Sequence, residues 1–177
     1  MRDLDLSQHP TIRPGQVWLA EQAGSALHPL DHEALLDANV VIYARSLAPL
    51  VAQLLPMGAY AEPLPPEVPP GRVAPRALRF AAEGWSVVQL TEACPGSRAR
   101  LRDAGAALIR SGIPGEMPVQ TIVKPLVRSA CISSASVRDL IDLSDEPGTH
   151  PLTLVFGPFA MGHPSYAHLF TAHGLAG

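Results

Sequence analysis

Short apolar segments alternate with helix-like segments between residues 16 and 123, and this alternation constrains the fold more than any other feature. Strands are expected at residues 16–20, 40–43 and 85–90 and at the end of 113–123, where β-branched and aromatic residues gather. Helices are expected between them at residues 30–38, 49–55, 76–83 and 98–111. This order predicts an α/β fold with a mostly parallel sheet flanked by helices.

The segments outside this alternation are harder to assign. Residues 56–75 contain seven prolines, which cannot sit inside a helix or a central strand, so an extended loop or a lid is expected. Beyond residue 123 the pattern suggests a helix over 134–141 capped by Ser134 or Ser136, a strand at 152–156 and a last helix at 166–172. Asp31 is expected to accept from free amides at the start of the first helix.

Composition excludes several classes of protein. The formal charge is −3 and Lys124 is the sole lysine, so a nucleic-acid partner is not expected. No apolar run reaches the ~18–20 residues that a membrane helix needs, and residues 1–14 do not resemble a signal peptide. The two cysteines, Cys94 and Cys131, are far apart and are interpreted as free thiols. We therefore expect a soluble, cytoplasmic protein without a membrane partner.

Four sequence segments, in order, resemble the tetrapyrrole methylase family. They are Gly-Gln-Val-Trp-Leu at residues 15–19, Ala-Asn-Val-Val-Ile-Tyr-Ala-Arg at 38–45, Ala-Ala-Glu-Gly-Trp-Ser-Val-Val-Gln-Leu at 81–90 and Gly-Ile-Pro-Gly-Glu-Met-Pro at 112–118. The segment 152–157 is similar to the strand that opens the core of the family's second lobe. The resemblance implies a flexible leader at 1–14, the family's first lobe at 15–123 and a truncated second-lobe remnant at 124–177.

The resemblance also implies an activity and a site. Members of the family, such as uroporphyrinogen-III C-methyltransferase, transfer a methyl group from S-adenosylmethionine to a tetrapyrrole ring carbon, and they are homodimers. The positions that match the cofactor loops are Gly24, Ser25, Cys94 and Pro95, and those that match the substrate side are Tyr43 and Arg45. A tetrapyrrole of sirohaem or cobalamin metabolism is the substrate that the resemblance implies.

The cofactor loops depart from the family pattern. Gly-x-Gly-Pro-Gly-Asp is replaced by Ala-Glu-Gln-Ala-Gly-Ser-Ala at residues 20–26, Tyr-Asp-Arg by Tyr-Ala-Arg at 43–45 and Gly-Gly-Asp-Pro by Glu-Ala-Cys-Pro at 92–95. Three lost interactions of ~1–3 kcal/mol each would weaken cofactor binding by ~10³ or more. We therefore expect weak or no methyl transfer. The alternatives are a non-catalytic tetrapyrrole-binding or protein-docking regulatory module, and a likeness of fold alone.

Other side chains are candidates for a site. His28 and His32 stand four residues apart, but Pro29 lies between them and no general-base Glu accompanies them, so no metal is expected. Cys94 would be reactive if it started a helix, and an inert loop thiol is the alternative. Cys131 is expected in the core. Arginine forks suit the carboxylates of a tetrapyrrole, which makes Arg45 and Arg79 candidates, with a solubilising surface role as the alternative.

Overall fold

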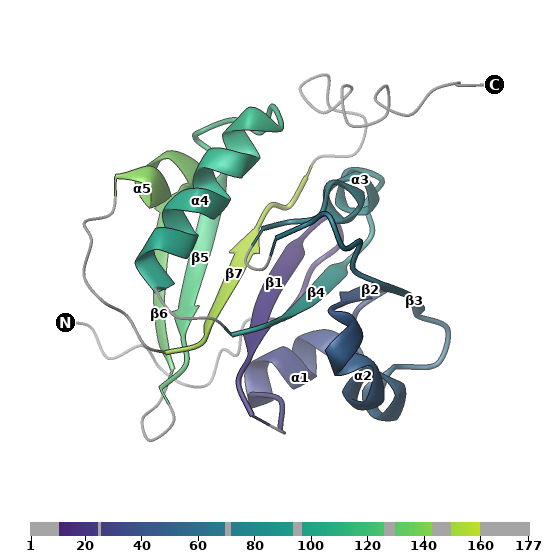
Figure 1. The fold of residues 1–177 in the computed structure, drawn as a ribbon. Helices are drawn as coiled ribbons and strands as arrows, with labels where there is room; N and C mark the ends of the chain where they lie inside the picture. The colour runs from purple at the N-terminus through teal and green to yellow at the C-terminus, as the bar shows by residue number, and fades with distance from the viewer. Residues whose placement is uncertain are drawn as a thin grey trace.

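The computed structural model describes residues 11–24, 26–69, 72–93, 97–125, 130–142 and 150–159. Within them the chain forms an α/β fold built on one mixed sheet of seven strands in the order β3-β2-β4-β1-β7-β5-β6 (Figure 1). The strands are β1 (Val17–Gln22), β2 (Val40–Tyr43), β3 (Tyr60–Pro63), β4 (Val87–Glu92), β5 (Pro118–Val123), β6 (Cys131–Ser136) and β7 (Leu152–Phe156). The helices are α1 (Pro29–Leu36), α2 (Ala48–Leu54), α3 (Pro75–Ala82), α4 (Ser97–Arg110) and α5 (Val137–Ile141), with a short 3-10 helix η1 (Arg45–Leu47) before α2.

The sheet is mixed rather than mostly parallel. β3, β2, β4 and β1 pair in parallel, whereas β7 pairs antiparallel with both β1 and β5, and β6 pairs antiparallel with β5. All five strands up to residue 123 therefore run in one direction, as their helical crossovers require. The reversal comes from the two later strands: β6 follows β5 after a connection too short for a crossover, and β7 inserts between β1 and β5.

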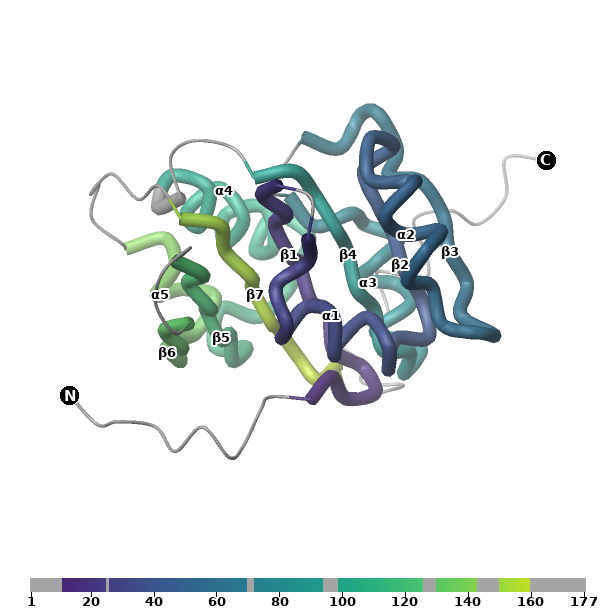
Figure 2. The backbone as a smooth tube through the Cα atoms, turned by 90° about the horizontal axis from the view of Figure 1, so that it is seen from below, coloured from purple at the N-terminus to yellow at the C-terminus, as the bar shows by residue number. Residues whose placement is uncertain are grey.

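Helices cover both faces of the sheet, and each face has its own apolar core (Figures 1 and 2). α1 and α2 cover one face, which we call the α1 face, where Leu35 and Val51 pack with Trp18 of β1. α3, α4 and α5 cover the other face, which we call the α4 face. There Leu78 and Leu108 lie in one apolar cluster with the residues of β1 and β4 that point to this face. Side chains of one strand alternate between the two clusters because successive residues of a strand point to opposite faces.

Helix ends follow the local sequence. Pro75 occupies the first turn of α3, where its missing N–H costs nothing, and Gly84 ends the helix at φ +93°. Ser136 caps α5: its hydroxyl accepts from the Asp139 N–H, while the Asp139 carboxylate accepts from the Ser136 N–H. Of the two serines expected to cap this helix, Ser136 is the one that does.

Three sequence-based expectations need correction, and a fourth lies outside the described residues. Residues 60–63 form strand β3 inside the proline-rich segment expected to be a loop, because Pro63 lies at the end of an edge strand that tolerates proline. Residues 131–136 form β6, so the helix expected from residue 134 starts at Val137. Cys131, expected in the core, is exposed because β6 is an edge strand. The helix expected at 166–172 lies outside the described residues.

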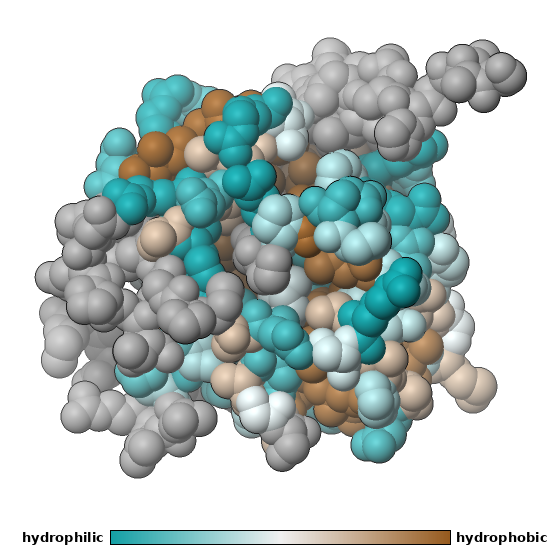
Figure 3. Space-filling view, viewed as in Figure 1, coloured by the Kyte–Doolittle hydropathy of each residue, from teal (hydrophilic) through white to brown (hydrophobic). Residues whose placement is uncertain are grey.

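The surface of the described residues mixes polar and apolar side chains, as the face in Figure 3 shows. The large apolar side chains that are exposed are Leu36, Met57, Tyr60, Trp85 and Ile109. No helix within the described part of the chain is both long enough and apolar enough to cross a membrane.

Candidate functional site

The carboxyl ends of three parallel strands lie next to one another, and we call this end of the sheet the carboxyl edge. β1 and β4 are paired as far as Gln22 and Glu92, and the Ala93 N–H continues the ladder by donating to the Gln22 carbonyl at 2.9 Å. On the other side of β4, the Ala44 N–H donates to the Leu90 carbonyl at 2.9 Å, which fixes the end of β2 beside β4. The segments that follow β1, β4 and β2 therefore start side by side.

The chain leaves β1 and β4 toward opposite faces of the sheet. After β1 it enters α1 on the α1 face, and after β4 it enters α4 on the α4 face. In open α/β sheets, ligands bind in the crevice that such a divergence creates at the carboxyl ends of the strands. The loops that resembled cofactor loops are the two that diverge here. Of their residues, Gly24 is described, whereas Ser25, Cys94 and Pro95 lie outside the described residues.

A surface groove adjoins this edge on the α1 face. It has a volume of about 280 Å³ and is lined by Gly24, Ser46, Leu47, Pro49, Leu50 and Gln53. Gly24 adopts φ +84° and has open space where a side chain would project. None of the lining side chains titrates near neutral pH, so this lining offers hydrogen bonds and apolar contacts but no general acid or base.

The two candidate substrate residues lie at the end of β2, beside the groove. Tyr43 is the last residue of β2 and packs half-buried against the α1-face core. Arg45 begins η1 and is exposed, directly before Ser46 of the groove lining. Arg79 is not part of this group, because α3 carries it on the α4 face, where it pairs with Glu83 at 3.4 Å.

A buried ion pair lies beneath this edge on the α1 face. The ammonium of Lys124, immediately after β5, donates to Asp31 Oδ2 at 2.6 Å and to the Glu21 carbonyl at 2.7 Å. Thr153 Oγ1 of β7 donates to the other carboxylate oxygen of Asp31 at 2.7 Å. The side chains of Lys124 and Asp31 are 3% and 1% exposed, so both charges depend on each other for compensation.

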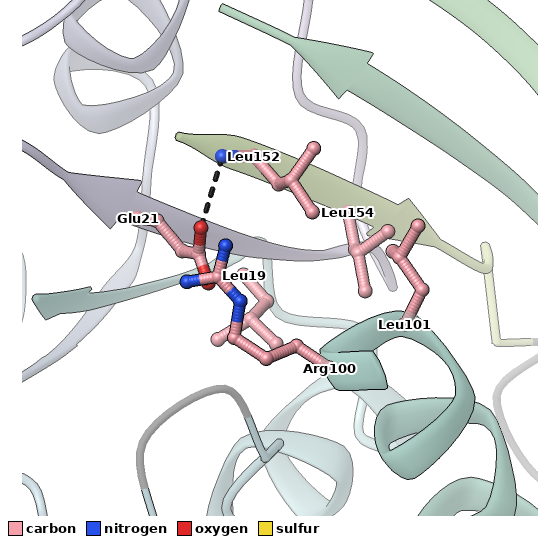
Figure 4. A pocket seen from close by; sticks show the side chains of 6 residues that line it. All are labelled: Leu19, Glu21, Arg100, Leu101, Leu152 and Leu154. Carbon is pink, nitrogen blue, oxygen red and sulfur yellow. Dashed lines mark hydrogen bonds and ion pairs between the residues drawn. The ribbon is translucent and has the colours of Figure 1, made fainter. Parts of the chain in front are cut away.

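A second buried charge cluster lies on the α4 face of the same strand end (Figure 4). Glu21 accepts from the Leu152 N–H at 3.0 Å and pairs with the Arg100 guanidinium, which reaches over from α4, at 2.8 Å. Burial raises the pKa of the Glu21 carboxyl, although Arg100, the Leu152 amide and Lys124 each act to lower it. The adjoining cavity, lined also by leucines of β1, β7 and α4, measures only about 10 Å³, room for one water at most.

The loop after β1 is held by its own side chains. The Gln22 amide nitrogen donates to the Ala26 carbonyl at 2.5 Å and to the Gly24 carbonyl at 3.3 Å. Because Gln22 is buried, these bonds stabilise the turn at the position where the resemblance implied a glycine-rich cofactor loop. The carboxyl end of β1 is thus filled by Glu21, Gln22 and their partners.

This charge network was not predicted from the sequence, and the role expected of its acid was wrong. Asp31 was expected to cap the first helix, but it is buried against Lys124, and His28 caps α1 by accepting from the Leu30 N–H at Nδ1, 3.3 Å away. Burial lowers the pKa of His28, while Asp31 opposes that shift and Lys124 adds to it. The sequence feature that could have indicated this network is that Lys124, the sole lysine, directly follows an apolar strand.

Metal ligands are not clustered in the described part of the chain: no three side chains of His, Cys, Asp or Glu come together there in an arrangement that could hold an ion. Comparison with known proteins adds no family to this picture, since neither the protein-family models nor the curated proteins contain a match to this chain.

Proposed function

We propose that this chain is a tetrapyrrole methylase-like protein of cytoplasmic tetrapyrrole metabolism, with weak or no methyl transfer from S-adenosylmethionine. Its ligand site is the edge formed by the carboxyl ends of β1, β4 and β2. The observation that carries the proposal is that the two loops with eroded cofactor motifs diverge from neighbouring parallel strands. The resemblance of the four segments supplies the ligand class.

The groove beside this edge supports binding of a carboxylate-rich ring. Arg45 provides an exposed guanidinium next to the groove, and the groove lining adds polar groups from Ser46 and Gln53. A guanidinium pairs well with carboxylates because its planar donors match their oxygens. Tyr43 would contribute an aromatic surface at the end of β2.

The hydrogen bonds inside the loop after β1 support the proposal that methyl transfer is weak or lost. Gln22 already occupies the turn with two hydrogen bonds, and Glu21 beside it is committed to Arg100. Methyl transfer depends mainly on positioning the cofactor, so a loop that is held by its own side chain rather than open to the cofactor would support poor transfer. The same observation favours the second candidate, a non-catalytic tetrapyrrole-binding or protein-docking regulatory module.

The test is a calorimetric titration of the purified protein with S-adenosylhomocysteine and then with uroporphyrin III. We expect no binding of the first and measurable binding of the second. Arg45→Gln should weaken uroporphyrin binding about 10- to 100-fold, because a hydrogen bond to a charged group contributes ~1.5–3 kcal/mol. Arg79→Gln, which changes a half-exposed arginine on the α4 face, is the control and should leave binding unchanged.

Each contrary result has a definite meaning. Micromolar binding of S-adenosylhomocysteine would refute the loss of the cofactor site and would call for a methyl-transfer assay. Uroporphyrin binding that responds equally to both arginine substitutions would refute the proposed location. If neither ligand binds, the remaining possibilities are a protein-docking role or a likeness of fold alone.

A further inference from the structure

One edge of the sheet is open to another strand. β6 forms this edge, and among the described residues no strand pairs with its outer side (Figure 1). The opposite edge, β3, carries Glu62 and Pro63, residue types that discourage pairing with a further chain. β6 reads Cys-Ile-Ser-Ser-Ala-Ser and has neither a charge nor a proline. Edge protection is therefore present at β3 and missing at β6.

The hydrogen bonds to β5 determine which backbone groups of β6 point outward. The Val137 N–H donates to the Met117 carbonyl at 3.0 Å, one position beyond the paired residues and in the same register. Opposed residues of antiparallel strands alternate between hydrogen-bonded and non-hydrogen-bonded pairs. The odd-numbered residues of β6 therefore bond to β5, and Ile132, Ser134 and Ser136 direct their N–H and C=O groups outward.

One of these outward groups is already used. The Ser136 N–H donates to Asp139 Oδ2 at 2.8 Å as part of the cap of α5. Ile132 and Ser134 are left as two consecutive outward positions, each offering a donor and an acceptor. That arrangement is self-complementary in an antiparallel pairing, because each position can face the other.

We propose that β6 pairs with the β6 strand of a second copy of this chain, antiparallel about a two-fold axis at Ser133. Ile132 then faces Ser134 of the partner subunit, and the two such pairs make four interchain hydrogen bonds. An axis at Ser134 would set Ile132 opposite Ser136 of the partner subunit, whose N–H is taken. Because β6 itself is uncharged, the pairing brings no like charges together within the two strands, and two-fold symmetry supplies the same groups from each side. This inference is independent of the proposed ligand.

The first test removes the outward donor of β6. Ser134→Pro deletes the N–H of Ser134 from both copies, so two of the four bonds are lost, while the bonds to β5 remain. Sedimentation equilibrium should show a dimer for the unmodified chain and a dissociation constant at least about 30-fold higher for Ser134→Pro, from two bonds of ~1 kcal/mol. Ser134→Ala keeps the N–H and should stay dimeric. Proline is tolerated at an outward position of an edge strand, so thermal unfolding followed by circular dichroism should confirm that Ser134→Pro folds.

The second test reads the register directly. In a Cys131→Ser background, Ser133→Cys places two thiols at the two-fold axis in a non-hydrogen-bonded pair, where Cα atoms lie ~4.5 Å apart, within disulfide range. Mild oxidation should yield a covalent dimer in high amount. Ser134→Cys in the same background sets the thiols diagonally and should cross-link far less, and the background alone controls for Cys94. A monomer at all concentrations, a Ser134→Pro variant that stays dimeric, or equal cross-linking by both cysteine variants would overturn the proposal.

Discussion

Replacing Lys124 by methionine tests the buried ion pair between α1 and the end of β5. Methionine has a similar length and apolar stem, so the substitution removes the ammonium and its hydrogen bonds to Asp31 and the Glu21 carbonyl, at 2.6 and 2.7 Å, with little change in volume. The carboxylate of Asp31 would remain buried, and within the described residues its remaining hydrogen bond is the one from the Thr153 hydroxyl. An uncompensated buried charge of this kind costs about 3–5 kcal/mol.

That cost is large enough to measure by thermal and by urea unfolding, each followed by far-ultraviolet circular dichroism. For a chain of this size, 1 kcal/mol corresponds to roughly 2–4 °C in Tm, so Lys124→Met should lower Tm by about 6–20 °C. The triple variant Asp31→Leu, Lys124→Met, Thr153→Val replaces the whole group by apolar side chains. It should recover to within about 2 kcal/mol of the unmodified protein, because a buried pair is rarely better than a well-packed apolar substitute.

The comparison between these variants is what tests the reasoning. A loss below about 1 kcal/mol for Lys124→Met would mean that the Asp31 carboxylate is solvated, and the burial argument would be refuted. A triple variant less stable than Lys124→Met would refute the claim that the unpaired charge, rather than lost packing, causes the destabilisation.

Three further predictions concern the turns and the titrating groups. Gly15→Ala should lower the free energy of unfolding by more than ~2 kcal/mol and Gly24→Ala by only ~1 kcal/mol. Both glycines have positive φ, but a Cβ on Gly15 would lie 2.7 Å from the Phe159 carbonyl oxygen, whereas one on Gly24 meets open space. Urea titration of the two variants measures the difference, and equal losses would contradict the prediction. The lowered pKa of His28 means that, as pH falls, the unfolded chain takes up a proton at His28 before the folded chain does. Stability should therefore fall as pH drops below 6.5 through the lower folded value. His28→Asn should reduce the slope of stability against pH, and an unchanged slope would exclude His28 as the cause of that slope. The raised pKa of Glu21 has the opposite effect on stability. The stability of the unmodified protein relative to Glu21→Gln should increase as pH falls from neutral toward 4.5. A decrease would show that the ion pair with Arg100 outweighs burial.

The regular part of the fold was predictable because its signals are local. The β-branched run at residues 40–43 and the glycine stop at Gly84 were confirmed as strand β2 and the end of α3. β3 was missed because a short edge strand depends on its neighbour: Pro63 can end it only since β2 supplies the pairing on the inner side. Likewise, Cys131 was expected in the core because its flanking residues are apolar, and only the position of β6 in the sheet makes it exposed.

The placement of the candidate site residues could be predicted, whereas the buried contacts beneath them could not. The positions of Gly24, Tyr43 and Arg45 follow from strand order, which the resemblance suggested, and they lie at one edge of the sheet. The pairing of Asp31 with Lys124 joins residues 93 positions apart, and neither residue's sequence neighbours specify it. Such long-range pairs depend on where the antiparallel strand β7 enters the sheet, which no local pattern indicates. The ligand class and the family remain predictions.

The position of β7 also determines when a growing chain can assemble. β7 is the last strand of the described part of the chain, yet it lies between β1 and β5, pairing Trp18 with Val155 and Val119 with Phe156. Until residue 156 has left the ribosome, the strands made first can form only two separate groups, β1 to β4 and the β5–β6 hairpin. Each group would present an unpaired inner edge, the kind of surface on which nascent chains aggregate. Completion of the sheet is thus a late insertion, and the interval before it is when the chain would depend most on a chaperone.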